Sequence, residues 1–195
     1  MQVIRSTDYR RMPWKNGGGE TAEIALSPAG AALDAFDWRV SMASVNSDGP
    51  FSAFANVDRT LAILSGAGIR LVVAGRDSVE LSGASTPYGF PADLPTTATL
   101  VDGPITDLNV MTRRGRASHR VHRLDVAAPR AYALAAHTTL LVVVFGAIRL
   151  SATTGNLTTQ SLGPRDSLVA GRSDRSLRME PQARAAVLII EIDTP

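Results

Sequence analysis

Short runs of apolar and β-branched residues, separated by turn residues, recur from one end of the chain to the other. Clear examples are WRVSMASV (38–45), GIRLVVAG (68–75), DLNVMT (107–112) and AAVLIIEI (185–192). Runs of this length, bounded by Gly, Pro, Asp and Ser, are typical of β-strands. No long stretch shows the 3.6-residue period of an amphipathic helix. The pattern predicts an all-β protein, in which residues 27–37 form a loop.

One of these patterns occurs twice. TLAILSGAGIRL (60–71) and TLLVVVFGAIRL (139–150) align without a gap at an offset of 79 residues, and each reads as strand, turn of small residues, strand. Such internal repetition predicts two similar β-barrels, one over residues 1–116 and one over residues 117–195, whose terminal strands are free to exchange. Alternate residues of a small barrel face an interior that is filled by side chains or holds one ligand.

The composition limits the possible cellular compartment of the protein and the chemistry available to it. Cysteine is absent, which excludes disulfides, thiolate nucleophiles and cysteine zinc sites. The start, MQVIRSTDYRR, lacks the apolar stretch of a secretory signal. The longest apolar run, LLVVVFGAI (140–148), is far shorter than the roughly 20 residues of a spanning helix. We therefore expect a cytoplasmic protein with no membrane partner.

The charge pattern disfavours nucleic acid as a partner. Twenty basic and eighteen acidic residues leave a net charge of only +2. Basic residues do gather in RRGRASHRVHR (113–123), but no aromatic residue there could stack on a base. We interpret this segment as a solvated connector between the two halves.

Four motifs, in order, resemble those of a known family. They are PWKNGGGET (13–21), FDWRVSMASV (36–45), DGPFSAFANVDRTLAILSGAG (48–68) and DLNVMTRR (107–114), and they are similar to motifs of the HutD/Ves family. This bicupin group is associated in bacteria with histidine utilisation and stress genes. The match is close over residues 1–115 and looser beyond them. The resemblance implies a bicupin fold, small-molecule binding, and a regulatory or accessory link to histidine breakdown.

The residues ahead of the first turn differ from those of metal-binding cupins. Such cupins place two histidines and a glutamate there, because a divalent ion needs imidazole and carboxylate ligands that converge. This chain has Phe51, Ser52 and Phe54 at the histidine positions and Asp58 near the acidic one. Its three histidines, at 119, 122 and 137, lie elsewhere. We expect neither a metal nor another cofactor.

A binding site is easier to derive than a catalytic one. Arg59 shares a strand face with Leu61 and Ile63, so an inward-facing guanidinium would be desolvated and would need an anion. That anion is either a protein carboxylate, such as Asp58, or the carboxylate of a ligand. Arg39 presents the same choice, and Asn109 could offer a donor and an acceptor. Apolar walls are expected from Phe51, Phe54, Met42 and Met111.

The glycine-rich run 13–21 is not a nucleotide loop. Its lysine precedes the glycines, and the TAEIAL that follows alternates like a strand, so neither phosphate-binding motif fits. Lys15 is the only lysine in the chain. We predict that Trp14, Lys15 and Asn16 form the rim of the pocket on its carboxylate side, with backbone N–H groups approaching an anion. The alternative is that the glycines serve packing alone.

These observations favour a metal-independent bicupin that binds a small carboxylate in a sensor or accessory role linked to histidine utilisation. No nucleophile motif is visible, so catalysis is not indicated. One alternative is a metal-free isomerase with Asp58 or Asp107 as the base. Another is an interaction protein without a ligand, whose second barrel forms the face of a homodimer.

Overall fold

The computed structural model describes residues 1–152 and 159–195, and over these ranges the chain forms nineteen β-strands. No helix in the described ranges could cross a membrane. The expected all-β class is confirmed. Contacts divide the chain into two units, which we name the first barrel (Arg10–Ser118) and the second barrel (Met1–Tyr9 and His119–Thr194).

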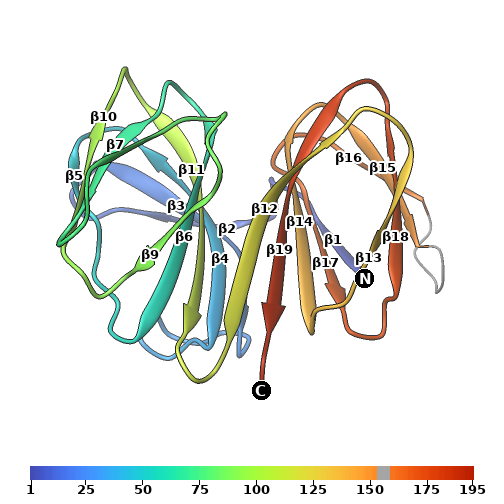
Figure 1. The fold of residues 1–195 in the computed structure, drawn as a ribbon, viewed down its shortest axis with the longest axis horizontal. Helices are drawn as coiled ribbons and strands as arrows, with labels where there is room; N and C mark the ends of the chain where they lie inside the picture. The colour runs from blue at the N-terminus through green and yellow to red at the C-terminus, as the bar shows by residue number, and fades with distance from the viewer. Residues whose placement is uncertain (153–158) are drawn as a thin grey trace. The chain divides into compact units, whose positions relative to one another are not determined.

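The first barrel runs from blue to green in Figure 1. Its strands are β2 (Arg10–Pro13), β3 (Gly19–Ser27), β4 (Trp38–Val45), β5 (Gly49–Pro50), β6 (Val57–Ser65), β7 (Ile69–Val73), β8 (Val79–Leu81), β9 (Tyr88–Pro91), β10 (Thr96–Leu100) and β11 (Ile105–Arg113). They form a six-stranded sheet, β2-β3-β4-β11-β6-β9, and a four-stranded sheet, β5-β10-β7-β8. Residues 28–37 connect β3 to β4 as turns and loop, as expected.

The second barrel combines the start of the chain with its second half. Its strands are β1 (Gln2–Ile4), β12 (Ser118–Val126), β13 (Arg130–Ala133), β14 (Thr138–Phe145), β15 (Ile148–Ala152), β16 (Gln160–Leu162), β17 (Ser167–Gly171), β18 (Ser176–Pro181) and β19 (Ala185–Asp193). The sheets are β1-β17-β14-β19-β12 and β13-β18-β15-β16. Because β1 pairs with β17, the first nine residues lie in this barrel.

Corresponding strands of the two barrels follow the same order, but the repeat contains a one-residue gap. Gly66 (φ +94°) and Gly146 (φ +76°) occupy the same turn, where a Cβ would collide with Pro104 O or Arg184 O. Gly66 is preceded by Ser65 and followed by two residues before β7, whereas one residue separates Gly146 from β15. The ungapped alignment is therefore wrong ahead of the turn. Since strands alternate, the one-residue shift would exchange inward for outward positions.

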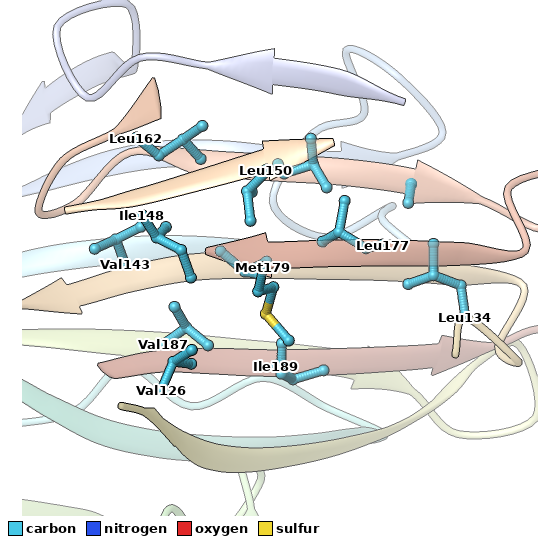
Figure 2. Close-up of a cluster of buried hydrophobic side chains, with 13 residues drawn as sticks. Val126, Leu134, Val143, Ile148, Leu150, Leu162, Leu177, Met179, Val187 and Ile189 are labelled. Carbon is cyan, nitrogen blue, oxygen red and sulfur yellow. The ribbon is translucent and has the colours of Figure 1, made fainter. Parts of the chain in front are cut away.

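The interior of the second barrel is apolar throughout its centre. Figure 2 shows the side chains of β14, β15, β18 and β19 pointing toward one another there. The cluster comprises Val126, Leu134, Leu141, Val143, Ile148, Leu150, Leu162, Leu168, Ala170, Leu177, Met179, Val187 and Ile189. A core filled in this way leaves this barrel stabilised mainly by apolar burial.

The arginine-rich segment 113–123 is more structured than a solvated connector. Its first residue ends β11 and residues 118–123 belong to β12. Arg113 donates hydrogen bonds to the carbonyl oxygens of Phe36 and Asp34, and Arg114 pairs with both Asp58 and Asp93 at 2.8 Å. These arginines hold loops of the first barrel together.

Candidate functional site

Several polar side chains gather on the inner face of the six-stranded sheet of the first barrel. Arg59 on β6 lies directly opposite Met111 on β11, which lies opposite Arg39 on β4. Asn109 and Asp107 follow Met111 at two-residue steps along β11. Residues that oppose one another, or alternate along a strand, share a face. The register therefore brings Arg59, Arg39, Asn109 and Asp107 to the same side.

The guanidinium of Arg59 is buried with incomplete hydrogen bonding. The side chain is 5% exposed, and its Nη2 donates to Met111 Sδ at 3.3 Å. Its Nε and Nη1 have no hydrogen-bond partner. The neighbouring Asp58 is exposed and pairs with Arg114, so the protein carboxylate suggested by the sequence is not the partner of Arg59. A buried polar group without a partner costs about 1–3 kcal/mol.

Aromatic rings surround this guanidinium. The Arg59 Cζ atom lies 5.2 Å from the centre of the Phe51 ring, 5.3 Å from Phe54 and 5.9 Å from Phe90. Aromatic faces attract a cation and compensate for part of its lost hydration. They leave Nε and Nη1 without an acceptor, so the cation is stabilised while two of its nitrogens stay available.

Asp107 is the second incomplete group on this face. Its side chain is fully buried, and its Oδ1 accepts a hydrogen bond from Asn109 Nδ2 at 2.6 Å, while its Oδ2 has no partner. Burial raises the pKa of Asp107 to about 7. The charge of Arg59, a backbone hydrogen bond from Ala43 and the side-chain hydrogen bond from Asn109 lower this pKa, but by less. Burial also lowers the pKa of Arg59 to about 10. At neutral pH Arg59 is therefore charged, and Asp107 lies near its midpoint.

Arg39 already has a protein partner. It is 5% exposed, and its Nε donates to Glu23 Oε2 at 2.9 Å in a nearly buried ion pair. The sequence left open whether Arg39 pairs with a protein carboxylate or a ligand carboxylate, and the structure shows the protein carboxylate of Glu23. Asn109, 7% exposed, is oriented by its hydrogen bond to Asp107.

The glycine-rich turn lies at the other end of the strands. Lys15 and Asn16 are exposed there. The turn adjoins Gly19, which pairs with Val45 at the end of β4. Val45 and Arg39 are six residues apart on β4, which corresponds to about 20 Å along the strand. The N–H groups of the turn bond within it: Gly17 to the Trp14 carbonyl oxygen at 3.0 Å, Gly18 to Asn16 Oδ1 at 3.1 Å. The structure does not bring Lys15 and Asn16 to Arg59.

The remaining predicted site residues fall into two groups, those that contact Arg59 and those that do not. Phe51, Phe54 and Met111 contact Arg59. Trp14 packs against the apolar interior and donates from Nε1 to Thr21 Oγ1 at 2.8 Å. Met42 lies opposite Leu108, one position out of phase with Asn109, and therefore points to the other face.

Sequence reasoning left three residues out of the site. Asp107 was considered only as a catalytic base, although its alternation with Asn109 and Met111 already placed it on their face. Phe90 and Glu23 enter through the pairing of β9 with β6 and of β3 with β4, for which the local sequence has no signal.

The two aspartates considered as alternative bases, Asp58 and Asp107, do not lie together. Asp58 lies opposite Thr112 and Asp107 lies opposite Ile63, so their side chains leave the sheet on opposite faces. Nor do the residues of this barrel fit a cupin metal. Phe51, Ser52 and Phe54 offer no imidazole, and the described residues contain no group of three His, Cys, Asp or Glu side chains that could hold a metal ion.

The second barrel has different residues at the positions equivalent to Arg59, Asp107 and Asn109. Counted through the shared turn, Arg59 corresponds to Thr139 and Asp107 to Val187, since Val187 pairs with Val143 as Asp107 pairs with Ile63. Asn109 corresponds in the same way to Ile189, which lies in the apolar cluster. The barrel fold therefore does not require buried charges at these positions.

Two barrels of this construction define a cupin-like protein. The oxalate decarboxylase of Lactobacillus farciminis, solved as a formate complex, has the same fold, with a TM-score of 0.69 at 7% identity over 97% of this chain and 85% of that one. The HutD family model matches residues 6–189. The chain belongs to the HutD family, which confirms the resemblance seen in the sequence.

Relatives and solved structures agree with this assignment. A 21.2 kDa protein of the hutC 3′ region of Pseudomonas putida is 35% identical over 96% of both chains, and protein Ves of Citrobacter koseri is 38% identical over 60% of this chain and 62% of its own. The Pseudomonas aeruginosa protein PA5104, of unknown function, superposes with a TM-score of 0.90 at 34% identity, covering 99% and 98% of the two chains. HutD of Pseudomonas fluorescens SBW25, described as "Formate condition", gives 0.81 at 31% identity, covering 100% and 98%.

Proposed function

We propose that the protein binds a small carboxylate in its first barrel, with Arg59 as the anchoring cation, in a sensor or accessory role linked to histidine utilisation. The observation that supports this most directly is the buried guanidinium whose Nε and Nη1 have no partner. A carboxylate accepts charge-assisted hydrogen bonds from such a group and removes the cost of leaving it incomplete.

The surroundings of Arg59 favour a small anion over a large one. Phe51 and Phe54 are half-buried and cover the guanidinium, which leaves only 5% of the Arg59 side chain exposed. An anion that enters exchanges water for apolar walls and a few polar groups, as is usual in small-ligand sites. Asn109 and Asp107 supply the polar groups beside Arg59.

The biological setting of this proposal comes from the relatives. The Pseudomonas putida protein belongs by its description to a hutC region, and the Pseudomonas fluorescens structure is described by a formate condition. Formate and formylated or acidic products of histidine breakdown are therefore the first carboxylates to test.

Thermal stability against a ligand panel tests the proposal. We expect at least one of formate, N-formylglutamate, glutamate and urocanate to stabilise the protein, by roughly 2.7 kcal/mol at 100 times its Kd, while histidine serves as the amino-acid comparison. R59L should abolish this shift. R70L, which removes an exposed arginine from β7, is the matched control and should retain it. No shift with any carboxylate, or a full shift in R59L, contradicts the proposal.

A further inference from the structure

A second buried group of the same site also has an unpaired atom. Asp107 Oδ2 has no hydrogen-bond partner, and neither do Nε and Nη1 of Arg59. The charge of each group favours the charged form of the other and so shifts its pKa. Asp107 lies on the same interior face as Arg59, four residues along β11 from Met111, which is opposite Arg59. A carboxylate held by Arg59 therefore shares this interior with a second carboxyl group. Two carboxylates that share a buried site do not both ionise, because their repulsion raises the pKa of one strongly.

We propose that Asp107 contacts the ligand as a neutral acid, donating the proton on Oδ2 to the carboxylate held by Arg59, so that each ligand bound above neutral pH takes up one proton. This inference rests on the proposed function and adds to it the protonation state of the site. When Asp107 is ionised in the free protein, it takes this proton from solvent as the ligand binds. The proton stays on Asp107 and forms the hydrogen bond O–H···O⁻ to the ligand. Hydrogen bonds of this kind are short and strong.

The other charged groups on this face do not offer an equivalent proton. Arg59 on β6 is a cation, and Arg39 on β4 is paired with Glu23 on β3. Ala43 and Ile63 flank Asp107 on the two neighbouring strands, and Asn109 binds its Oδ1. The facing sheet contributes the apolar Leu71, Val73 and Ala98. It also contributes the buried Thr96, whose hydroxyl donates to the Leu94 carbonyl oxygen. Burial raises the pKa of Asp107 on this face to about 7, so its ionisation changes near neutral pH.

The opposite arrangement would have the opposite pH dependence. If an ionised Asp107 accepted an N–H or O–H from the ligand, the affinity would rise as the pH passes 7. If Asp107 made no contact, the affinity would not follow its ionisation. The sign of the pH dependence therefore identifies the role of Asp107.

Formate titrations by calorimetry from pH 6 to pH 9 provide the test, since formate is fully ionised over this range. We expect the affinity of the wild-type protein to fall about tenfold per pH unit above pH 7, as one required proton is lost. At pH 8, titrations in two buffers of different ionisation enthalpy should show an uptake close to one proton per formate.

Two variants distinguish the effect of the Asp107 proton from the effect of the size and shape of its side chain. D107N keeps a donor at every pH, so its affinity should be independent of pH and its proton uptake zero. D107V introduces the residue of the second barrel, which folds around Val187 at this position, and should bind formate weakly at every pH. A flat or rising affinity in the wild-type protein overturns the role of Asp107 while leaving the Arg59 site standing. Absence of formate binding at every pH overturns both.

Discussion

Arg59 and Asp107 bury a guanidinium and a carboxyl group without completing their hydrogen bonds. Cores usually place such groups in contact with each other or replace them by apolar residues, which are often more stabilising. Here Arg59 is covered by aromatic rings and Asp107 is bound on one oxygen only. The combination leaves a cation and an acid oriented toward the same interior, which is the property a carboxylate site needs.

The ionisation of Asp107 should be visible in the stability of the folded protein. Its pKa is raised to about 7, so between about pH 4 and 7 the folded state holds a proton that the unfolded chain releases. The stabilisation present below pH 4 is therefore lost as the pH rises through 7. Relative to D107N, the wild-type free energy of unfolding should fall by up to about 4 kcal/mol between pH 4 and 8.

Urea unfolding at several pH values measures this difference. D77N, which changes an exposed aspartate on the loop after β7, serves as the control and should follow the wild-type curve. Parallel curves for wild type and D107N would show that Asp107 is ionised in the folded protein throughout the range.

At the scale of single strands, alternation predicted most of the site. The two-residue period correctly placed Arg59 with Leu61 and Ile63, and Asn109 with Met111. The period also placed Met42 away from Arg39, although we had expected both in one pocket. What alternation cannot supply is the neighbouring strand, so Phe90 and Glu23 became visible only with the sheet register.

The run PWKNGGGET has a structural explanation within its hairpin. Gly17 has a φ of +71°, and Gly19 lies so close to Ser44 O and the Trp14 ring that a Cβ atom would overlap them. The close packing of Trp14 over Gly19 joins this turn to the barrel interior. Two of its three glycines thus have a packing or backbone requirement that involves no ligand.

Alanine substitutions test this explanation. G19A should lower the free energy of unfolding by about 2 kcal/mol or more, since the Ser44 backbone cannot move without disturbing the β3–β4 pairing. G49A, on β5, is the control: a Cβ there meets no atom within 4 Å, and its effect on unfolding should be small. Equal stabilities in urea unfolding would contradict the packing role of Gly19.

At the scale of the whole chain, one fold is used with two different interiors. The all-β class expected from the sequence is confirmed. The repeat in the sequence does not reveal the one-residue gap at the turn, and therefore does not reveal the correspondence of Arg59 with Thr139. That correspondence requires the positions of Gly66 and Gly146 in three dimensions. It also explains why the second half, with Val187 and Ile189 inside, lacks the polar residues that mark the first.

This difference between the barrels makes a prediction about stoichiometry. One formate should bind per chain, because Arg59, Asp107 and Asn109 occur only in the first barrel, whereas the equivalent positions of the second hold Thr139, Val187 and Ile189.

The most direct measurement is therefore the binding of formate by isothermal titration calorimetry at pH 6, with wild type and R59L compared at equal concentration. We predict a saturable isotherm with one site per chain for wild type and no measurable binding for R59L, with R59L remaining folded by circular dichroism. Binding of equal affinity in folded R59L, or two sites per chain, would contradict the assignment of the carboxylate site to Arg59 in the first barrel.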